Sequence, residues 1–495
     1  MKRRTVLLSI LLVTALAAVS VILPTLRAPR ITPVVLSSEP EVILEPQAAS
    51  ASPSIGGPIT LVAVTRTKNG FSLQAQPVDP TTLTALPGYA PINLGADHTY
   101  AISPDHKTLA VITWPSGSNI RGVLHLIALE TWTDTPAELR FEEDVSDLTF
   151  SPDGKALYWT IPTEHYPSGS YQLLRYDLPH RQLSVISQFS ASFVPWAQQV
   201  VSDKVAIFGV PTASNYFAEA APRVLVIDPA RNLITADLQL EGILAGQFRE
   251  PPPEATLTPP GDNWQYTQYN PGLAWDVKHS ALYVAPANDD TVTRIDLAKG
   301  VIVKQSSLAI TEWLSELLAP TAEAKGGTVK QERTVLSPDG KWLYVFSQKT
   351  EWAMLSTASL RLIATDGMRE VNRLDELLTD FALTPDGQSL LILKAEIVNP
   401  YGFDMPVNRD LYILDAKTLR ERAHLRLNQV DQRSFKGFSA DGHAVYLQED
   451  SARWIEGAGW RDWQNQWQRL DLNSYRLVAA DKSDTSFATL LHIGP

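Results

Sequence analysis

A five-residue turn, Ser-Pro-Asp-Gly-Lys or a close variant, recurs along this chain, and a strand-like apolar run follows each clear copy. The clear copies lie at residues 103–107, 151–155, 337–341, 384–388 and 439–443, and weaker copies lie at 202–204 and 276–278. Proline presets the first bend of a type I turn, aspartate tolerates the next position, and glycine adopts the left-handed conformation that closes a hairpin. The repeated aspartate therefore indicates a repeated turn rather than a catalytic group.

A second turn alternates with the first. A strand ends in aspartate, a short polar turn follows, and another apolar stretch begins. These aspartates are Asp79, Asp177, Asp228, Asp296, Asp415 and Asp471. Two hairpin turns that alternate with a period of ~50 residues predict four antiparallel strands per repeat, as in a propeller blade.

The repeats predict an all-β protein, a β-propeller of about eight four-stranded blades, with seven blades as the alternative. The units span residues 59–90, 98–141, 147–190, 194–242, 272–308, 333–366, 380–427 and 435–482. The first unit has no copy of the first turn and lacks an opening strand. We expect the C-terminal segment 486–494 to supply that strand and so close the ring.

The stretches SPDGKALYW, SPDGKWLYV and LYVAPANDDTVTRIDLAKGVIV resemble the YVTN and WD40-like (TolB-type) propeller repeats of bacterial extracytoplasmic proteins. The resemblance covers nearly all of residues 98–482. It implies a β-propeller fold and little about activity, because such propellers serve as binding platforms, enzyme domains and assembly factors.

The N-terminus predicts export. Three basic residues precede Val6–Leu23, an uncharged apolar run of 18 residues. This length just suffices for one membrane-spanning hydrophobic helix, which would anchor the chain in the cell membrane with the propeller outside. A cleaved signal peptide is the alternative, because Ala18 and Ser20 form a small-x-small pattern, and the protein would then be secreted. Domain boundaries follow at 1–23, a Pro/Ala/Ser-rich linker at 24–58, and the propeller at 59–495.

Composition excludes some functions. The chain has no cysteine, so disulfides, thiolate catalysis and cysteine metal sites are absent. Its net charge of -12 disfavours nucleic-acid binding. The nine histidines contain no close pair, and no phosphate-binding glycine pattern is present. Asn288–Asp290, the nearest acidic cluster, is interpreted as a solvated hairpin tip. No cofactor, metal ligand or catalytic residue is predicted.

Insertions between the repeats are where function is expected, at 242–271, 309–332, 396–409 and 451–466. The first is too proline-rich for regular structure, and its Trp264, Tyr266 and Tyr269 either line a pocket or pin the loop onto the blades. Trp454, Trp460 and Trp463 sit on an inserted hairpin tip, where they contact a ligand or partner or simply pack. By alignment with the other repeats, Trp467 is an ordinary buried strand position.

Two short amphipathic helices are also predicted, at 311–320 and 369–378, each packed on a face of the propeller.

The sequence favours a binding scaffold for a protein or polymer partner at the cell envelope. The alternative is a propeller enzyme of lactonase, hydrolase or lyase type with a site at the central tunnel. The repeated turn aspartates do not supply that site, because equivalent positions on neighbouring blades lie ~10 Å or more apart. A close carboxylate pair of the kind used in glycoside chemistry cannot form there.

Overall fold

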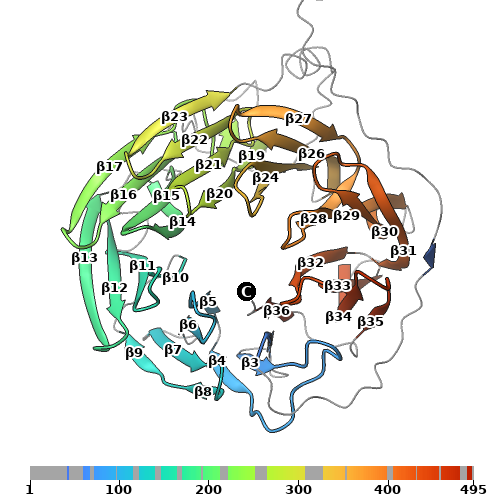
Figure 1. Cartoon of the computed structure of the whole chain (residues 1–495), viewed down its shortest axis with the longest axis horizontal. Coiled ribbons are helices and arrows are strands. Elements are labelled where there is room, and N and C mark those ends of the chain that lie inside the picture. Colours follow the sequence, from blue (N-terminus) through green and yellow to red (C-terminus); the bar gives the residue numbers. More distant parts are fainter. Residues whose placement is uncertain are drawn as a thin grey trace, which may run out of the picture.

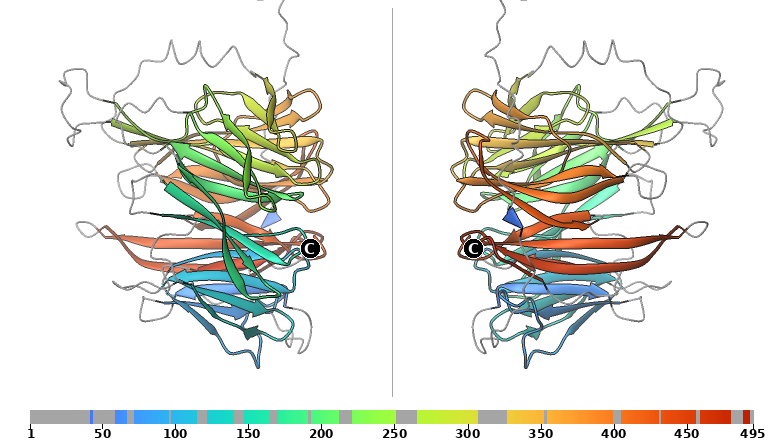
Figure 2. Two further views of the ribbon diagram at one scale, coloured as in Figure 1. Left: turned by 90° about the vertical axis from the view of Figure 1, so that its left-hand side faces the viewer. Right: turned by 90° about the vertical axis from the view of Figure 1, so that its right-hand side faces the viewer.

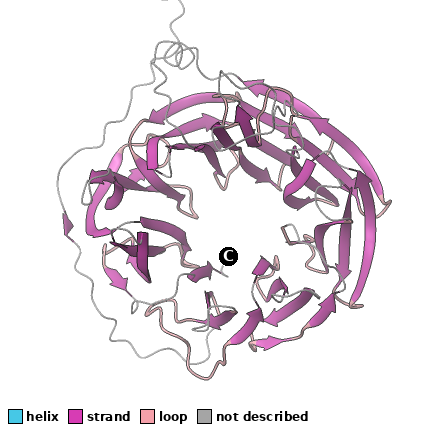
Figure 3. Ribbon diagram, turned by 180° about the vertical axis from the view of Figure 1, so that it is seen from behind, coloured by secondary structure: helices cyan, strands magenta, loops and turns pink. Residues whose placement is uncertain are grey.

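The structure is a computed structural model that describes residues 42–43, 59–66, 72–95, 97–114, 122–139, 147–163, 170–190, 193–211, 221–250, 265–306, 327–351, 354–398, 405–430, 432–455, 459–479 and 488–492. Eight sheets are arranged around a central axis (Figures 1 and 3). Every regular element of the described residues is a strand. The eight-bladed prediction is confirmed.

Each blade runs from an innermost to an outermost strand. Blade 1 contains β36 (Ala488–His492), β2 (Leu61–Arg66), β3 (Leu73–Pro77) and β4 (Ile92–Gly95). Blade 2 contains β5 (Asp97–Ile102), β6 (Thr108–Trp114), β7 (Gly122–Ala128) and β8 (Thr133–Asp134), with β9 (Ala137–Leu139) also on β7. Blade 3 contains β10 (Thr149–Phe150), β11 (Ala156–Pro162), β12 (Ser170–Asp177) and β13 (Gln182–Ser190). Blade 4 contains β14 (Phe193–Val201), β15 (Lys204–Pro211), β16 (Arg223–Asp228) and β17 (Leu233–Gln239).

The second half of the ring follows the same plan. Blade 5 contains β20 (Gly272–Asp276), β21 (Ala281–Ala285), β22 (Val292–Asp296) and β23 (Val301–Ser306). Blade 6 contains β24 (Gly327–Leu336), β25 (Trp342–Glu351), β26 (Met354–Ala364) and β27 (Arg369–Leu374). Blade 7 contains β28 (Leu378–Leu383), β29 (Ser389–Val398), β30 (Met405–Asp415) and β31 (Glu421–Val430), with β1 (Val42–Ile43) paired to β31. Blade 8 contains β32 (Gln432–Phe438), β33 (Ala444–Ile455), β34 (Gly459–Asp471) and β35 (Leu477–Ala479).

The antiparallel order gives the ring two different faces. In blades 2 to 8 the turns after the first and third strands lie on one face, which we call the turn face, and in blade 1 the turn after the third strand lies there. The connections after the second strand, and those leading to the next blade, lie on the other, which we call the insertion face. The long hairpin of β33 and β34 extends beyond the neighbouring blades (Figure 2).

The two ends of the propeller close the ring in one sheet, as predicted. β36 pairs antiparallel with β2, from Leu61 opposite His492 to Thr65 opposite Ala488. Leu491 is 3% exposed and belongs to the same apolar cluster as Val62. The innermost strand of blade 1 therefore comes from the end of the chain.

The repeated turn is built as the sequence indicates. In blade 3 the Gly154 amide donates to the Ser151 carbonyl oxygen at 2.9 Å, and Gly154 has a φ of 70°. The Ser151 hydroxyl donates to Asp153 Oδ1 at 2.6 Å and accepts the Ala156 amide at 2.9 Å. Asp153 Oδ1 also accepts the Lys155 amide at 3.1 Å. The Asp153 carboxylate thus accepts two hydrogen bonds from within its own turn.

Successive turns pack against one another around the turn face. A Cβ atom added at Gly387 of blade 7 would lie 3.0 Å from Cδ of Pro338 of blade 6. Since Gly387 also has a φ of 67°, both the conformation and the close approach favour glycine.

The second set of aspartates caps the outer turns. Asp228 Oδ1 accepts the amides of Ala230 and Arg231, at 3.0 and 3.1 Å. Asp471 Oδ1 accepts the amides of Asn473 and Ser474, at 3.1 and 2.8 Å. Both sets of repeated aspartates are therefore explained by backbone geometry.

The turn carboxylates make stability depend on acid pH. The adjacent serine hydroxyl is the main cause that lowers the pKa of each of four turn aspartates, Asp105, Asp153, Asp339 and Asp441. A carboxyl with a lowered folded-state pKa stabilises the fold above its unfolded pKa of about 3.9 and loses that contribution as pH falls through the lower value. We expect urea unfolding to show lower stability at pH 3 than at pH 5.

Ser151→Ala isolates one such turn. The substitution removes the hydroxyl that holds Asp153 and leaves the Ala156 amide without its acceptor, at a cost of about 1 kcal/mol. It should also reduce the loss of stability between pH 5 and pH 3. An unchanged pH profile in this variant would show that the serine does not lower the pKa of Asp153.

The core lies between neighbouring blades. Trp159 of β11 is fully buried and belongs to one cluster with Ile112 and Leu124 of blade 2. Similar clusters join blades 6 and 7, and blades 7 and 8. Because both faces of a blade are covered, its central strands read as continuous apolar runs, for example Ala281–Ala285.

Two predictions of local structure are wrong. Residues 369–378 do not form a helix, because Arg369–Leu374 is β27, whose residues pair with β26 and alternate in burial at its start. The insertion 242–271 is not devoid of regular structure. Its ends form β18 (Gly246–Glu250) and β19 (Gln265–Asn270), and β19 extends blade 6 by parallel pairing with β24. Long-range pairing supplied the partner strand that local composition could not reveal.

The predicted helix at 311–320 and the apolar segment Val6–Leu23 lie outside the described residues. Within the part of the chain that the structure describes, no helix has the length and apolarity to cross a membrane.

Candidate functional site

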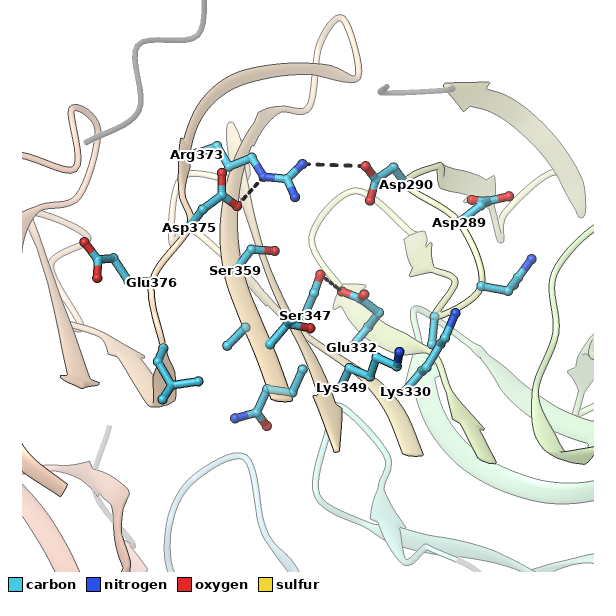
Figure 4. Close-up of a pocket in the computed structure, with 16 residues that line it drawn as sticks. Asp289, Asp290, Lys330, Glu332, Ser347, Lys349, Ser359, Arg373, Asp375 and Glu376 are labelled. Atoms are coloured by element: carbon cyan, nitrogen blue, oxygen red, sulfur yellow. Dashed lines mark hydrogen bonds and ion pairs between the residues drawn. The ribbon is translucent and has the colours of Figure 1, made fainter. Parts of the chain in front are cut away.

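A cleft of about 610 Å³ opens between blades 5 and 6 on the insertion face (Figure 4). Its walls are the connection from β21 to β22, the ends of β24, β25 and β26 that lie toward the insertion face, and the connection from β27 to β28. The strands β24 to β26 have 10 or 11 residues each, whereas β20 to β22 have five. This extra length carries polar side chains past the packed core, where they line the cleft.

Charged residues of both signs dominate the lining. The acidic members are Asp289, Asp290, Glu332, Asp375 and Glu376, and the basic members are Lys330, Lys349 and Arg373. Ser347, Gln348, Thr357 and Ser359 add neutral donors and acceptors.

Arg361 is a buried arginine that contacts two residues of the cleft lining, Asp290 and Glu332. Its side chain is fully buried on β26, and its Nη1 lies 3.1 Å from Asp290 Oδ1 and donates to the Asp290 carbonyl at 3.0 Å. Its Nη2 lies 3.6 Å from Glu332 Oε2. Glu370 is also buried nearby, and burial raises the pKa of its carboxyl, although Arg361 opposes that rise. The guanidinium holds one carboxylate from blade 5 and one from blade 6 at their junction.

A second arginine closes one side of the cleft. Arg373 Nε donates to Asp375 Oδ1 at 2.6 Å, and Arg373 Nη1 lies 3.6 Å from Asp290 Oδ2. Glu376 forms an ion pair with Lys394 at 2.9 Å. Arg373 thus connects Asp290 of blade 5 with Asp375, and the separate Glu376–Lys394 pair connects this side of the cleft to blade 7.

Two lysines face each other across neighbouring strands on the other side. Lys330 of β24 and Lys349 of β25 are directly opposite in the register, and both are half-buried. Lys330 Nζ also lies 5.8 Å from the centre of the Tyr269 ring. The register therefore places two cationic side chains next to each other on this side of the cleft.

The arrangement can bind but offers no evident covalent chemistry. It presents cationic donors at Lys330 and Lys349, carboxylate acceptors at Asp289 and Asp375, and few apolar groups. Such a lining suits a polar ligand that carries an anionic group. Within the described residues, no group of three or more His, Asp or Glu side chains is arranged to hold a metal ion.

The predicted aromatic residues fall on two different blades. Tyr269 of β19 packs edge-to-face on Phe248, with ring centres 5.3 Å apart, and borders the cleft through Lys330. Tyr266 is 42% exposed on the same strand. Trp264 lies outside the described residues. Of the predicted residues, Tyr269 contacts a residue of the cleft lining, Lys330, but does not line the cleft itself.

The tryptophans lie on the long hairpin of blade 8. Trp454 of β33 is opposite Trp460 of β34, and Trp463 follows on β34. Their side chains lie outside the described part, so a ligand or partner contact there stays a prediction. Trp467 is only half-buried, packed against the cluster that contains Leu61 and Tyr446, whereas its equivalents Leu173 and Val224 are fully buried.

Sequence reasoning missed the charged residues of the cleft. Asn288–Asp290 was expected to be a solvated hairpin tip, and Asp289 does accept the Thr291 amide at 2.7 Å in that role. Asp290, however, has only 16% of its side chain exposed because Arg361 binds it. The one local signal was the unusual run of two acidic residues; the arginine partner stands 71 residues later.

The central tunnel is lined by the innermost strands. Along blades 4 to 8 the innermost strands form a concavity of about 560 Å³. The residues that line it include Trp196, Arg333, Phe381, Phe435 and Phe438. On the innermost side of blades 2 and 3, burial raises the pKa of Asp147. Asp147 is nevertheless exposed at the surface, so its carboxyl is only partly desolvated. Burial, and then the Asp147 charge, raise the pKa of Tyr100 on β5.

No protein-family model matches the chain, and no curated protein matches it significantly. Among solved structures, the chain is similar to dihydro-heme d1 dehydrogenase NirN in complex with DHE, with a TM-score of 0.52 and 13% identity, over 91% of this chain and 79% of that one. A eukaryotic initiation factor gives 0.44 and 12%, over 87% and 98%. The Cps50 (Swd1) propeller domain of Myceliophteria thermophila gives 0.39 and 13%, over 76% and 97%.

The NirN likeness shows the β-propeller fold alone. Membership in the YVTN or WD40-like repeat family stays a prediction.

Proposed function

We propose that this chain is an extracytoplasmic, membrane-anchored binding scaffold. Its cleft between blades 5 and 6 holds a polar segment of a protein or polymer partner at the cell envelope, with an anionic group of that segment at the two lysines. Val6–Leu23 would provide the membrane anchor, and the linker would hold the propeller clear of the membrane surface.

The opposed lysines carry this proposal. Lys330 and Lys349 bring two ammonium groups to the same side of the cleft, and a ligand carboxylate or phosphate placed between them would accept a charge-assisted hydrogen bond from each. The carboxylates on the other side of the cleft would accept hydrogen bonds from hydroxyl or amide groups of the same ligand. Tyr269 would offer a flat apolar surface beside Lys330.

The test uses the purified full chain, immobilised and exposed to envelope extracts. The double variant Lys330→Gln, Lys349→Gln should bind the partner about tenfold more weakly than the wild type does. This corresponds to a loss of about 1.4 kcal/mol in binding free energy. Lys341→Gln is the matched control, because Lys341 is exposed on the turn face. Equal retention by the double variant and the control would contradict the cleft as the binding site.

A propeller enzyme with a site at the tunnel is the second candidate function. The observation that favours it is Asp147, a water-accessible carboxyl with a raised pKa beside Tyr100. A carboxyl whose pKa is raised and which water reaches is a candidate general acid. The test is metal analysis of the purified protein together with a panel of lactone and ester substrates. Turnover that Asp147→Asn abolishes would support the enzyme, and neither metal nor turnover in the wild type would count against it.

A further inference from the structure

The outer rim of blades 3, 4 and 5 exposes a belt of apolar side chains, which we call the rim belt. Its members lie in the first half of the outermost strands β13, β17 and β23, and between 36% and 54% of each is exposed. They are Leu183, Val185, Leu233, Ile234, Val301, Ile302 and Val303. Apolar patches of this kind mark surfaces that contact other molecules.

Contacts between the blades make the rim belt continuous. With its amide oriented to satisfy both polar atoms, Asn232, which directly precedes β17, donates to the Ile186 carbonyl of β13 at 3.2 Å. A Cβ atom added at Gly300, which directly precedes β23, would lie 2.5 Å from Cβ of Ala236 on β17. The three outermost strands therefore present one surface rather than three separate ones.

A β-bulge interrupts each of these strands at the rim belt. The bulged residues are Ile186 of β13, Thr235 of β17 and Val303 of β23. A bulge breaks the row of backbone donors and acceptors at a sheet edge, so it disfavours the addition of a further strand there. A molecule that covers the rim belt therefore packs against its side chains.

Opposite charges flank the rim belt. Arg231 and Lys299 precede β17 and β23, and 78% and 77% of their side chains are exposed. The capping aspartates of the same turns are at most 16% exposed, because turn amides bind them. Toward the other end of β17, Asp237 pairs with Arg223 and still has 41% of its side chain exposed, and Glu241 is exposed two residues beyond the strand. The rim belt thus has a cationic margin at the turn face and an acidic margin at the opposite end.

These margins are complementary when the rim belt meets a second copy of itself. A two-fold contact uses the same patch on both subunits. An axis that runs along the rim, at right angles to β17, makes the two β17 strands antiparallel. It places Arg231 of one copy opposite Asp237 of the other, because each lies three residues from Ile234. An axis parallel to β17 would instead bring the two cationic margins together.

We propose that the chain associates with a second copy of itself through the rim belt, with the two β17 strands antiparallel and apolar side chains packed between them. β1, the described part of the linker, pairs with β31 across the ring from β13 and β17, so it does not cover the rim belt (Figure 1). The rim belt shares no residue with the cleft between blades 5 and 6, so this association stands or fails independently of the function proposed above.

Sedimentation equilibrium of the purified full chain in detergent tests the association. The wild type should give the protein mass of two copies. Leu233→Asp and Val301→Asp should each weaken the association at least about tenfold, because a carboxylate would be buried in the contact. Val277→Asp is the matched control and should associate as the wild type does, because Val277 is 42% exposed on the turn after the first strand of blade 5, outside the rim belt.

Disulfide trapping tests the orientation. The chain has no cysteine, so introduced thiols are the only ones present. A mixture of Arg231→Cys and Asp237→Cys chains should form disulfide-linked dimers on mild oxidation, whereas either variant alone should not. Lys417→Cys, which is exposed on the outer turn of blade 7, should form none when it is mixed with either variant.

A monomeric wild type would overturn the proposal. A dimer that both Leu233→Asp and Val301→Asp leave intact would overturn it too, because its contact would lie elsewhere on the chain. Failure of the mixed cysteine variants to cross-link, or cross-linking of each variant alone, would contradict the antiparallel contact and overturn the proposal as well.

Discussion

Replacing Arg361 by methionine should lower the free energy of unfolding by about 3–5 kcal/mol, because it removes the fully buried cation that the largely buried carboxylates of Asp290 and Glu332 share. Arg361 is fully buried and contacts Asp290 and Glu332, which come from different blades. The loss should appear in urea-induced unfolding followed by tryptophan fluorescence. The same variant should also lose partner binding, since the lining of the cleft rests on these contacts.

A double-mutant cycle separates the ion pair from simple packing. Asp290→Asn in the Arg361→Met background should cost less than Asp290→Asn alone, with a coupling energy of about 1–3 kcal/mol. Arg361→Lys, which keeps a cation at the site, should be less destabilising than methionine. A loss below about 1 kcal/mol for Arg361→Met would contradict a structural role for the buried charge, because that is the scale of exposed ion pairs.

Deleting residues 488–495 should open the ring and give the largest loss of stability among the variants considered. The deletion removes the whole of β36, uncovers the hydrogen-bonding edge of β2 and exposes the apolar surface around Leu491. An uncovered edge strand also promotes association between molecules. We expect a lowered melting temperature and aggregates on size-exclusion chromatography.

The point variant Leu491→Ala provides the graded control. It keeps the β36 backbone and creates only a cavity, for a loss of about 2–5 kcal/mol. A synthetic peptide of residues 486–495 should restore part of the melting temperature of the truncated chain in a concentration-dependent way. A truncated protein that melts as the full chain does and stays monomeric would show that closure does not depend on β36.

The fold could be predicted far better than the site. Ser151, Pro152, Asp153 and Gly154 determine their turn through contacts within six residues, so the same letters specify the same hairpin wherever they recur. Strand β27 was mistaken for a helix because its apolar spacing is compatible with both structures, and pairing with β26 decides between them. Strand β19 pairs with β18 and with β24, and its place in blade 6 could not be predicted because β24 begins 62 residues after the start of β19.

By itself the sequence determined the turns and the four-stranded repeat, since both depend on short-range backbone chemistry repeated in order. It favoured eight blades over seven and predicted the closing strand, and the structure decided both. Only the tertiary structure decided which side chains share a site. Arg361 meets Asp290 from 71 residues away, and Arg333 meets Asp380 from 47 residues away. The physical reason is that neighbouring blades approach side by side. Charged side chains that lie on separate strands therefore line a common cleft or tunnel wall only when the blades are packed in the ring.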